Sequence, residues 1–255
     1  MNDVTDRYNF CAMWPTLPVH RAPVLAAERA HVWRIDLDVD ADVQRQLAAH
    51  LSPDELARAM RFRTEILMRR HQAAHGALRA ILAGYLGTAP GALAIVSDAQ
   101  GKPHLADEPA LAFNLSHSGS LALLAVARAR PIGVDVEQVR VLPDAGLVAG
   151  RFFAPAEVQA WERLSGAAQT RAFYACWTRK EAYLKALGSG LARPLDSFVV
   201  SVDPDAPARL LSDAQDAQAA ERWCLAALDP GPDAIGAVVV AAPLGEIVTL
   251  TFALE

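Results

Sequence analysis

The segments expected to form strands and helices follow one order, and that order occurs twice along the chain. A strand is expected at residues 31–38, where apolar and polar residues alternate, and helices and further strands follow it. The same order of strand, helices and strands begins again near residue 129. Arg61-Phe62 precedes the long helix of the first part, and Arg151-Phe152 precedes the helices of the second. This repetition predicts an α+β protein whose two similar halves pack together as a pseudo-dimer within one chain.

The boundaries of the expected helices follow from capping residues and glycines. Ser52, Pro53 and Glu55 are typical of a helix start, and a longer helix over about residues 63–86 ends at Gly87. Further helices are expected at residues 155–164 and 167–187, and further strands at residues 93–97, 112–115, 121–127, 132–136, 198–202, 223–228, 236–240 and 246–252. We therefore divide the chain into an irregular N-terminal segment (1–30), an N-terminal half (31–128) and a C-terminal half (129–255).

Composition excludes several classes of protein. The 255 residues carry a formal charge of −5 and no long basic run, which disfavours general nucleic-acid binding. No run of 18 apolar residues predicts a membrane span, and no secretory signal is recognised at the N-terminus. The three cysteines have no metal-binding spacing, and an odd count without a disulfide framework fits a reducing compartment. We expect a soluble, cytoplasmic protein.

Lysine is rare in this chain. Only Lys102, Lys180 and Lys185 occur among its 24 basic residues, and the rest are arginines. A lysine is a compact point charge that an arginine does not replace geometrically. Chance is an acceptable explanation for Lys180, whereas the other two lie in segments that carry chemistry.

Residues Ile132 to Glu137 form the first of these segments. Asp135 and Glu137 are two apart on an expected strand and so point to the same face. Gly133 allows another backbone to approach closely. Neighbouring carboxylates repel each other unless a cation neutralises them, and magnesium typically takes one or two carboxylates with waters and substrate phosphates. The alternative is a strand edge with polar residues facing solvent.

The second segment, WTRKEAYLK, spans residues 177–185 of an expected helix. Glu181 and Lys185 are four apart and share a helix face. They could form an ordinary exposed ion pair. In the functional interpretation, Glu181 is a metal ligand or a base, and Lys185 contacts a phosphate or a leaving group. The helix alone does not decide between these two.

The remaining segments could bind anions. Residues 113–119 end an apolar strand in a polar corner whose Ser116 and His117 could contact an anion, although a hydrogen-bonded turn histidine is the commoner explanation. A Ser–His nucleophile pair does not fit, because adjacent side chains on an extended chain point apart. The turn 101–103 presents Lys102. Six arginines lie in or near the first two helices, and they could either bind phosphate, which suits arginine, or form an ordinary solvated helix face. They are Arg58, Arg61, Arg63, Arg69, Arg70 and Arg79.

Taken together and in order, these segments resemble the 4′-phosphopantetheinyl transferase superfamily. The family pattern is a G-x-D-x-E strand and, about forty residues later, a W-[ST]-x-K-E-[AS]-x-x-K helix. The matching residues are Gly133, Asp135, Glu137, Trp177, Thr178, Lys180, Glu181, Ala182 and Lys185. The G-K-P element at 101–103 and the F-N-x-S-H-S-G element at 113–119 are similar to those of the longer, two-halved type that activates surfactin synthetase and other peptide and polyketide synthetases. The resemblance runs from about Ser52 to Phe198.

The resemblance implies an activity and a set of site residues. The activity is magnesium-dependent transfer of 4′-phosphopantetheine from coenzyme A to a serine of an apo carrier protein, giving holo-carrier and adenosine 3′,5′-bisphosphate. Magnesium would be bound by Asp135, Glu137 and Glu181. Coenzyme A would be bound by Arg58, Arg70, Lys102, Pro103, Ser116, His117, Asp135 and Lys185. The catalytic residues would be Lys185, at the pyrophosphate, and Glu181, although a metal-bound water could serve as the base instead.

The resemblance also leaves several points open. Glu55 occupies a position that is often basic in the family, so phosphate binding there must be shared differently. Carrier proteins are acidic around their serine, and residues 138–154, with Arg140, Arg151, Phe152 and Phe153, are the candidate docking region. The carrier could be an acyl, peptidyl or polyketide carrier, and a monomer is expected. The rival functions are a nucleotide pyrophosphate hydrolase and a non-catalytic coenzyme A-binding module.

Overall fold

The computed structural model describes residues 14–21, 23–188 and 193–254 as a mixed α+β structure. The helices are α1 (Ala41–Ala49), α2 (Pro53–Ala59), α3 (Glu65–Leu86), α4 (Ala145–Phe152), α5 (Pro155–Glu162), α6 (Gly166–Leu187) and α7 (Ala219–Arg222). The strands are β1 (Thr16–Pro18), β2 (Arg29–Asp36), β3 (Ile95–Ser97), β4 (Pro103–Leu105), β5 (Leu111–Ser118), β6 (Leu121–Arg128), β7 (Ile132–Gln138), β8 (Phe198–Val200), β9 (Leu210–Asp213), β10 (Trp223–Leu228), β11 (Ala234–Ala241) and β12 (Glu246–Ala253). The expected α+β class is confirmed.

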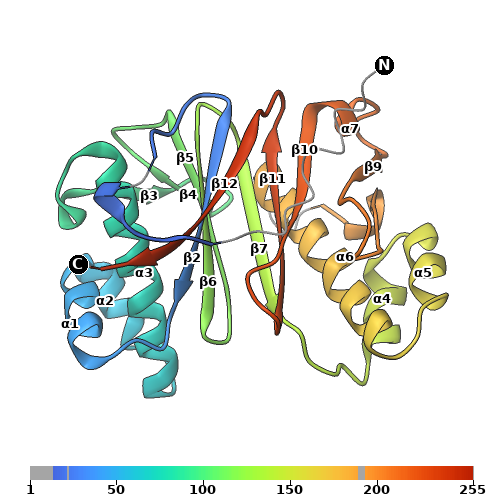
Figure 1. Cartoon of the computed structure of the whole chain (residues 1–255), viewed down its shortest axis with the longest axis horizontal. Coiled ribbons are helices and arrows are strands. Elements are labelled where there is room, and N and C mark those ends of the chain that lie inside the picture. Colours follow the sequence, from blue (N-terminus) through green and yellow to red (C-terminus); the bar gives the residue numbers. More distant parts are fainter. Residues whose placement is uncertain (1–13, 22, 189–192, 255) are drawn as a thin grey trace.

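Two sheets lie at the centre of the molecule, with helices on the outside (Figure 1). The first has the strand order β1-β12-β2-β6-β5, and the second has the order β10-β11-β7. Apolar residues from both sheets, among them Val32, Leu123, Val134 and Val238, form one fully buried cluster. Separate clusters lie between the first sheet and α3 and between the second sheet and α6. The resulting layers are helix, sheet, sheet and helix, as expected for two packed halves.

Each half is built around one long helix of 22 residues, α3 or α6. Both helices end at a glycine in the left-handed region, Gly87 at φ 64° and Gly188 at φ 70°. Glycine adopts this conformation at no steric cost, so the two helices stop where the sequence predicts. The predicted capping box at Ser52 is also present, since its hydroxyl accepts from Glu55 N and the Glu55 carboxylate accepts from Ser52 N.

The first thirty residues are not uniformly irregular, because β1 pairs in parallel with β12. Strand β12, placed by the sequence in the C-terminal half, lies in the first sheet between β1 and β2. The alternation of apolar residues explains this placement, since Ile247 and Leu250 are buried on opposite faces of the sheet, in two different clusters. The division of the chain at residue 128 itself remains a prediction.

The sequence also missed some local structure. Helix α1 begins after Asp40, whose carboxylate accepts hydrogen bonds from the amides of Asp42 and Val43. The polar corner at residues 116–118 is part of β5, because its backbone continues the pairing with β6 to Ser118↔Leu121. The turn follows at Gly119, at φ 58°. The polar residues belong to the strand because their partners come from β7, which is distant in sequence.

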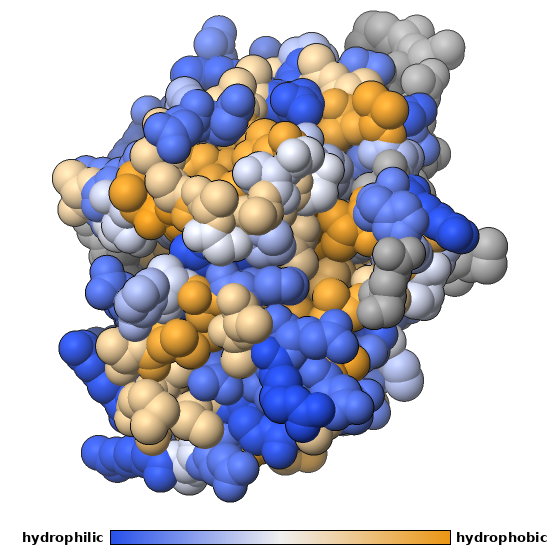
Figure 2. Space-filling view, turned by 90° about the vertical axis from the view of Figure 1, so that its left-hand side faces the viewer, coloured by the Kyte–Doolittle hydropathy of each residue, from blue (hydrophilic) through white to orange (hydrophobic). Residues whose placement is uncertain are grey.

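The surface is mixed in character. Figure 2, which views the molecule from the side of helices α1–α3, shows hydrophobic residues in separate patches among hydrophilic ones. No helix within the described residues is both long and apolar enough to cross a membrane.

Candidate active site between the two sheets

Polar side chains of β5 connect the two sheets where β5 and β7 lie side by side. The side-chain oxygen of Asn114, Oδ1, accepts from Val134 N at 2.8 Å. The hydroxyl of Ser116 donates to Asp135 Oδ1 at 2.7 Å, and that of Ser118 donates to Glu137 Oε2 at 2.6 Å. Alternate residues of one strand thus contact the acidic strand, which fixes the position of both carboxylates.

Helix α6 lies directly against β7 at Gly133. A Cβ atom at this position would collide with Ala182 O and Ala186 N of α6. Only glycine therefore permits the approach that brings Glu181 and Lys185 of the helix toward the carboxylates of the strand.

Lys185 joins β5, β7 and α6 in one contact group. Its ammonium nitrogen lies 2.6 Å from Asp135 Oδ1 and 2.9 Å from Ser116 Oγ, and it also donates to Val134 O at 3.2 Å. Asp135 is 5% exposed, and its second oxygen, Oδ2, is buried without a hydrogen-bond partner. An orphaned buried carboxylate oxygen is unusual and requires a ligand or a proton.

The three carboxylates influence one another. Burial raises the pKa of Asp135, Glu137 and Glu181 above the usual carboxyl values. The charge of Asp135 raises the pKa of the other two further, whereas the ammonium of Lys185 lowers the pKa of all three. The site therefore holds more negative charge than its single lysine offsets.

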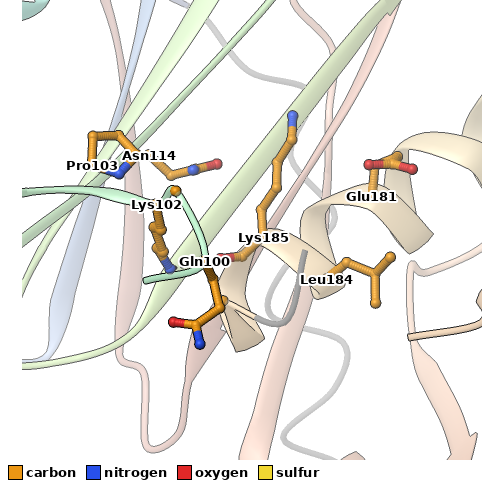
Figure 3. Close-up of a pocket in the computed structure, with 9 residues that line it drawn as sticks. Gln100, Lys102, Pro103, Asn114, Glu181, Leu184 and Lys185 are labelled. Atoms are coloured by element: carbon orange, nitrogen blue, oxygen red, sulfur yellow. Dashed lines mark hydrogen bonds between the residues drawn. The ribbon is translucent and has the colours of Figure 1, made fainter. Parts of the chain in front are cut away.

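A cavity of about 260 Å³ opens beside this group (Figure 3). Its walls come from the turn before β4, from β5 and from the end of α6. They are formed by Gln100, Gly101, Lys102, Pro103, Asn114, Glu181, Leu184, Lys185 and Gly188. The cavity thus brings together Lys102, Pro103, Glu181 and Lys185 from the predicted site. The additions are Gln100, Gly101, Asn114, Leu184 and Gly188, and of these Gly101 and Asn114 are fixed positions of the G-K-P and F-N-x-S-H-S-G motifs.

Lys102 does not point its ammonium group freely into the cavity. The nitrogen donates to the carbonyl oxygens of Lys185 at 2.6 Å, Ile132 at 3.2 Å and Ala186 at 3.4 Å. Burial lowers the pKa of Lys102. In this structure, the lysine binds the last turn of α6 and the start of β7, where backbone carbonyls attract a cation.

The two predicted coenzyme A-binding arginines lie outside this contact group. Arg70 forms a two-pronged ion pair with Asp38, with both nitrogen–oxygen distances at 2.6 Å. Arg58 is exposed in the last turn of α2, and it acts at a distance by lowering the pKa of His71 and His75.

Histidines near Arg58 were missed by the sequence analysis. The rings of His71 and His75 lie 4.2 Å apart between centroids, and burial lowers the pKa of both, with a smaller contribution from the charge of His117. His71 Nε2 is buried without a partner. His117 is exposed as a residue, and desolvation of its ring, together with Lys185, lowers its pKa. His71 and His75 are four apart on α3, a spacing that could have indicated the pair, whereas His117 comes from β5, which is distant in sequence.

The donor set suits a hard divalent cation, although it is not preassembled. Among the described residues, no three His, Cys, Asp or Glu side chains form a group that could hold a metal ion as they stand. The carboxylates of Asp135, Glu137 and Glu181 nevertheless offer oxygen ligands, raise one another's pKa, and include the orphaned Asp135 Oδ2. Oxygen donors with excess negative charge fit magnesium.

Comparison with known proteins agrees with this geometry. A family model described as the 4′-phosphopantetheinyl transferase superfamily matches residues 131–240, which include β7 and α6. The 4′-phosphopantetheinyl transferase HetI of Nostoc sp. is 43% identical over 220 residues, covering 85% of this chain and 90% of that protein. The chain belongs to the 4′-phosphopantetheinyl transferase superfamily.

Other members of the superfamily match shorter stretches. A 4′-phosphopantetheinyl transferase of Bacillus subtilis is 31% identical over 171 residues, covering 67% of this chain and 75% of that protein. The 4′-phosphopantetheinyl transferase Sfp of Bacillus subtilis strain 168 is 39% identical over 105 residues, covering 41% and 46% of the two chains. A solved structure of the Thermotoga maritima holo-[acyl-carrier-protein] synthase is 20% identical, covers 44% of this chain and 62% of that one, and has a TM-score of 0.32, which is too low to bear on the fold.

The structure also accounts for the acidic residue that departs from the superfamily pattern. Glu55 Oε2 lies 2.6 Å from Arg79 Nε, and Arg79 is buried at 3% exposure. Glu55 also completes the cap of α2. In this chain, the residue therefore neutralises a buried arginine and caps a helix.

Proposed function

We propose that this chain transfers 4′-phosphopantetheine from coenzyme A to a serine of an apo carrier protein. The observation that carries the proposal is the contact of Lys185 with Ser116 and Asp135, because it joins three motif segments from three elements in one site. A cavity for a ligand lies beside that contact.

The chain's own residues supply charge and position. Lys185 is placed to bind the pyrophosphate oxygens of coenzyme A and to stabilise the leaving phosphate. Ser116, whose hydroxyl lies 2.9 Å from the Lys185 nitrogen, and His117, the next residue of β5, would bind the phosphoadenosine end. Burial raises the pKa of Glu181, so this carboxylate is suited to accept the proton of the attacking serine.

Asp135, Glu137 and Glu181 would hold magnesium in this reaction. When bound, the ion would neutralise negative charge on the pyrophosphate. Asp135 would offer its unpartnered oxygen, Oδ2, to the ion, while Lys185 contacts the other oxygen, Oδ1.

The carrier protein would dock beside Glu137, on residues 140–147. Val141 and Leu147 are 85% and 77% exposed, and they flank a second cavity of about 160 Å³. This cavity is lined by Glu137, Arg140, Leu142, Val148, Phe173, Tyr174 and Trp177. An exposed apolar surface with a basic residue suits an acidic carrier with an apolar helix.

One residue of the docking region predicted from sequence does not fit. Phe153 is 3% exposed and packs on Phe173 at 5.3 Å between ring centroids, so it belongs to the core. Arg151, in contrast, is exposed and lies over the Phe152 ring at 5.2 Å.

The deciding experiment is the intact mass of an apo carrier protein after incubation with this protein, coenzyme A and magnesium. We expect a gain of one phosphopantetheine, roughly 340 Da from its formula, which EDTA or Asp135→Ala abolishes. Release of phosphopantetheine without a carrier would favour a hydrolase instead. Coenzyme A binding without any reaction, tested with several carrier classes, would favour a binding module.

The site combines β5 of the N-terminal half with β7 and α6 of the C-terminal half in one chain, so we propose a monomer. Light scattering during gel filtration tests this, and a dimeric mass at the assay concentration would contradict it.

A further inference from the structure

Buried cations in the described residues are paired with carboxylates, with one exception. Lys180 pairs with Glu157 at 2.7 Å, and both side chains are fully buried. Buried Arg79 pairs with Glu55, and Arg193 pairs with Asp213. Such pairing is the general rule, because an unpaired buried charge is strongly destabilising.

Arg179 of α6 is the exception. It is 1% exposed, and no carboxylate of the described residues lies within ion-pair distance of its guanidinium. Its Nη1 donates to the Ser201 carbonyl at 2.8 Å, the Ser201 hydroxyl at 3.1 Å and the Asp203 carbonyl at 3.0 Å. These three acceptors are neutral. Nε and Nη2 donate to no other described residue, so part of the guanidinium retains unused hydrogen-bonding capacity.

Burial without a paired carboxylate disfavours the charged form of this side chain. Burial lowers the pKa of Arg179 to about 10, and the charges of Cys176 and of exposed Asp203 only partly oppose this shift. An arginine keeps its proton at neutral pH under these conditions, so the positive charge is present and incompletely compensated.

A cavity of about 420 Å³ lies beside Arg179, between α6 and the hairpin of β10 and β11. Arg171, Ala175 and Arg179 are spaced four apart and line one wall as a single stripe of α6. Residues of the hairpin, Ala227 and Gly236 among them, form the opposite wall. The volume is in the range of small-molecule sites.

This cavity is separate from the candidate active site. The two cavities share no lining residue, although α6 contributes to both. Arg171 is half-buried and makes no ion pair with a described residue. Asp205 and Asp229 are exposed members of the lining. The positive charge is therefore at the buried part of the cavity, and the negative charge is at its exposed part.

We propose that this cavity is a second ligand site, which takes the phosphate or carboxylate group of a small molecule between Arg179 and Arg171. The guanidinium groups offer planar, multiple donors to such an oxyanion, and the anion supplies the countercharge that Arg179 lacks. Hydroxyl or amino groups of the same molecule would face Asp205 and Asp229.

The test is calorimetric titration of the full chain with orthophosphate, at constant ionic strength and with coenzyme A at saturation. Binding of coenzyme A is measured first, so a failure of the proposed function is recognised independently. We expect one phosphate to bind while coenzyme A is present. Arg171→Gln should weaken this binding at least about tenfold, which corresponds to about 1.4 kcal/mol. Arg163→Gln, at the exposed end of α5, is the matched control and should leave it unchanged.

A parallel titration with citrate distinguishes the two oxyanions. Binding of citrate but not phosphate, with the same dependence on Arg171, would assign the site to carboxylates. Loss of all binding when coenzyme A is present, or equal binding by Arg171→Gln and the unmodified chain, would overturn the proposal. Arg179→Met should also abolish binding, and if it does not fold, Arg171→Gln alone decides.

Discussion

The ammonium nitrogen of Lys102 lies 2.6 Å from the backbone carbonyl oxygen of Lys185, so two of the three lysines are joined by a hydrogen bond from side chain to backbone. The same nitrogen contacts Ile132 O at the start of the acidic strand. The turn at residues 101–103 is thereby tied to both elements that carry the carboxylates. Several carbonyls meet at one nitrogen, which a compact ammonium satisfies better than a planar guanidinium.

We predict that Lys102 acts by positioning α6 rather than by binding the 3′-phosphate of coenzyme A. Lys102→Met should lower kcat/KM about tenfold or more, because hydrogen bonds from a charged group are lost where α6 meets β7. The preference for coenzyme A over dephospho-coenzyme A, which lacks the 3′-phosphate, should stay unchanged. Initial rates with both substrates measure this, and His117→Ala should reduce the preference. A loss of preference in Lys102→Met would mean that the lysine contacts the phosphate.

Gly133→Ala should disrupt the site and the fold together. The added methyl group collides with backbone atoms of Ala182 and Ala186, which cannot rotate away. We expect a loss of about 1–3 kcal/mol in the free energy of unfolding, together with reduced transfer activity. Urea denaturation measures the first, and the intact-mass assay measures the second. Gly150→Ala is the control, since a Cβ there meets nothing within 4 Å. Equal stability of the two variants would show that β7 and α6 are not held at this distance.

Stability should fall as the pH decreases from 6.5 toward 4, because of His31. This fully buried ring hydrogen-bonds to the Tyr85 hydroxyl at 2.6 Å, and burial, with a smaller contribution from Arg29, lowers its pKa to about 4. Below pH 6.5, the unfolded chain binds a proton at this histidine, whereas the folded chain does not. The contribution of His31 to stability is therefore complete above pH 6.5 and is lost progressively below it. The shift corresponds to a loss of about 3 kcal/mol by pH 4. His75 contributes in the same direction.

Urea denaturation at several pH values tests this contribution. His31→Gln should flatten the decrease between pH 6.5 and 4, whereas His104→Gln, at an exposed position, should not. An unchanged slope in His31→Gln would show that this ring does not control acid stability.

Val141→Asp should weaken the reaction with the carrier while leaving coenzyme A unaffected. The residue is 85% exposed beside the cavity that borders Glu137, and a carboxylate there would repel an acidic carrier. We expect kcat/KM for the carrier to fall about tenfold, with an unchanged Kd for coenzyme A. Val24→Asp, 83% exposed in the N-terminal segment, is the matched control. If both variants behave alike, the carrier docks elsewhere.

Phe153→Ala should act differently, through the core. The ring is buried, so its removal should cost about 3–5 kcal/mol of folding free energy. Thermal unfolding measures this loss. If Phe153→Ala is as stable as the unmodified chain but reacts more slowly with the carrier, Phe153 contributes to the docking surface and not to the core.

The sequence predicted the α+β class, both long helices and the acidic strand, because these depend on local signals. Ser52, Gly87 and Gly188 mark helix ends through capping and left-handed backbone, which neighbouring residues alone decide. The spacing of Asp135 and Glu137 on a strand likewise requires no tertiary information.

Contacts between distant elements could not be predicted in this way. Arg70 pairs with Asp38, and Lys102 donates hydrogen bonds to backbone carbonyls of α6. The packing of distant elements determines both partners. Lys180, for which chance seemed a sufficient explanation, is fully buried against Glu157. In each case the residue type indicated a charge, and only the fold decided which group would meet it.

Strand β12 lies between β1 and β2, although it comes last of the described elements. A ribosome therefore releases β2, β5 and β6 long before the strand that completes their sheet. Until then, β2 presents an unpaired edge. Folding of the N-terminal half thus ends only after the C-terminal half has been synthesised, so the two halves cannot mature as independent units during translation.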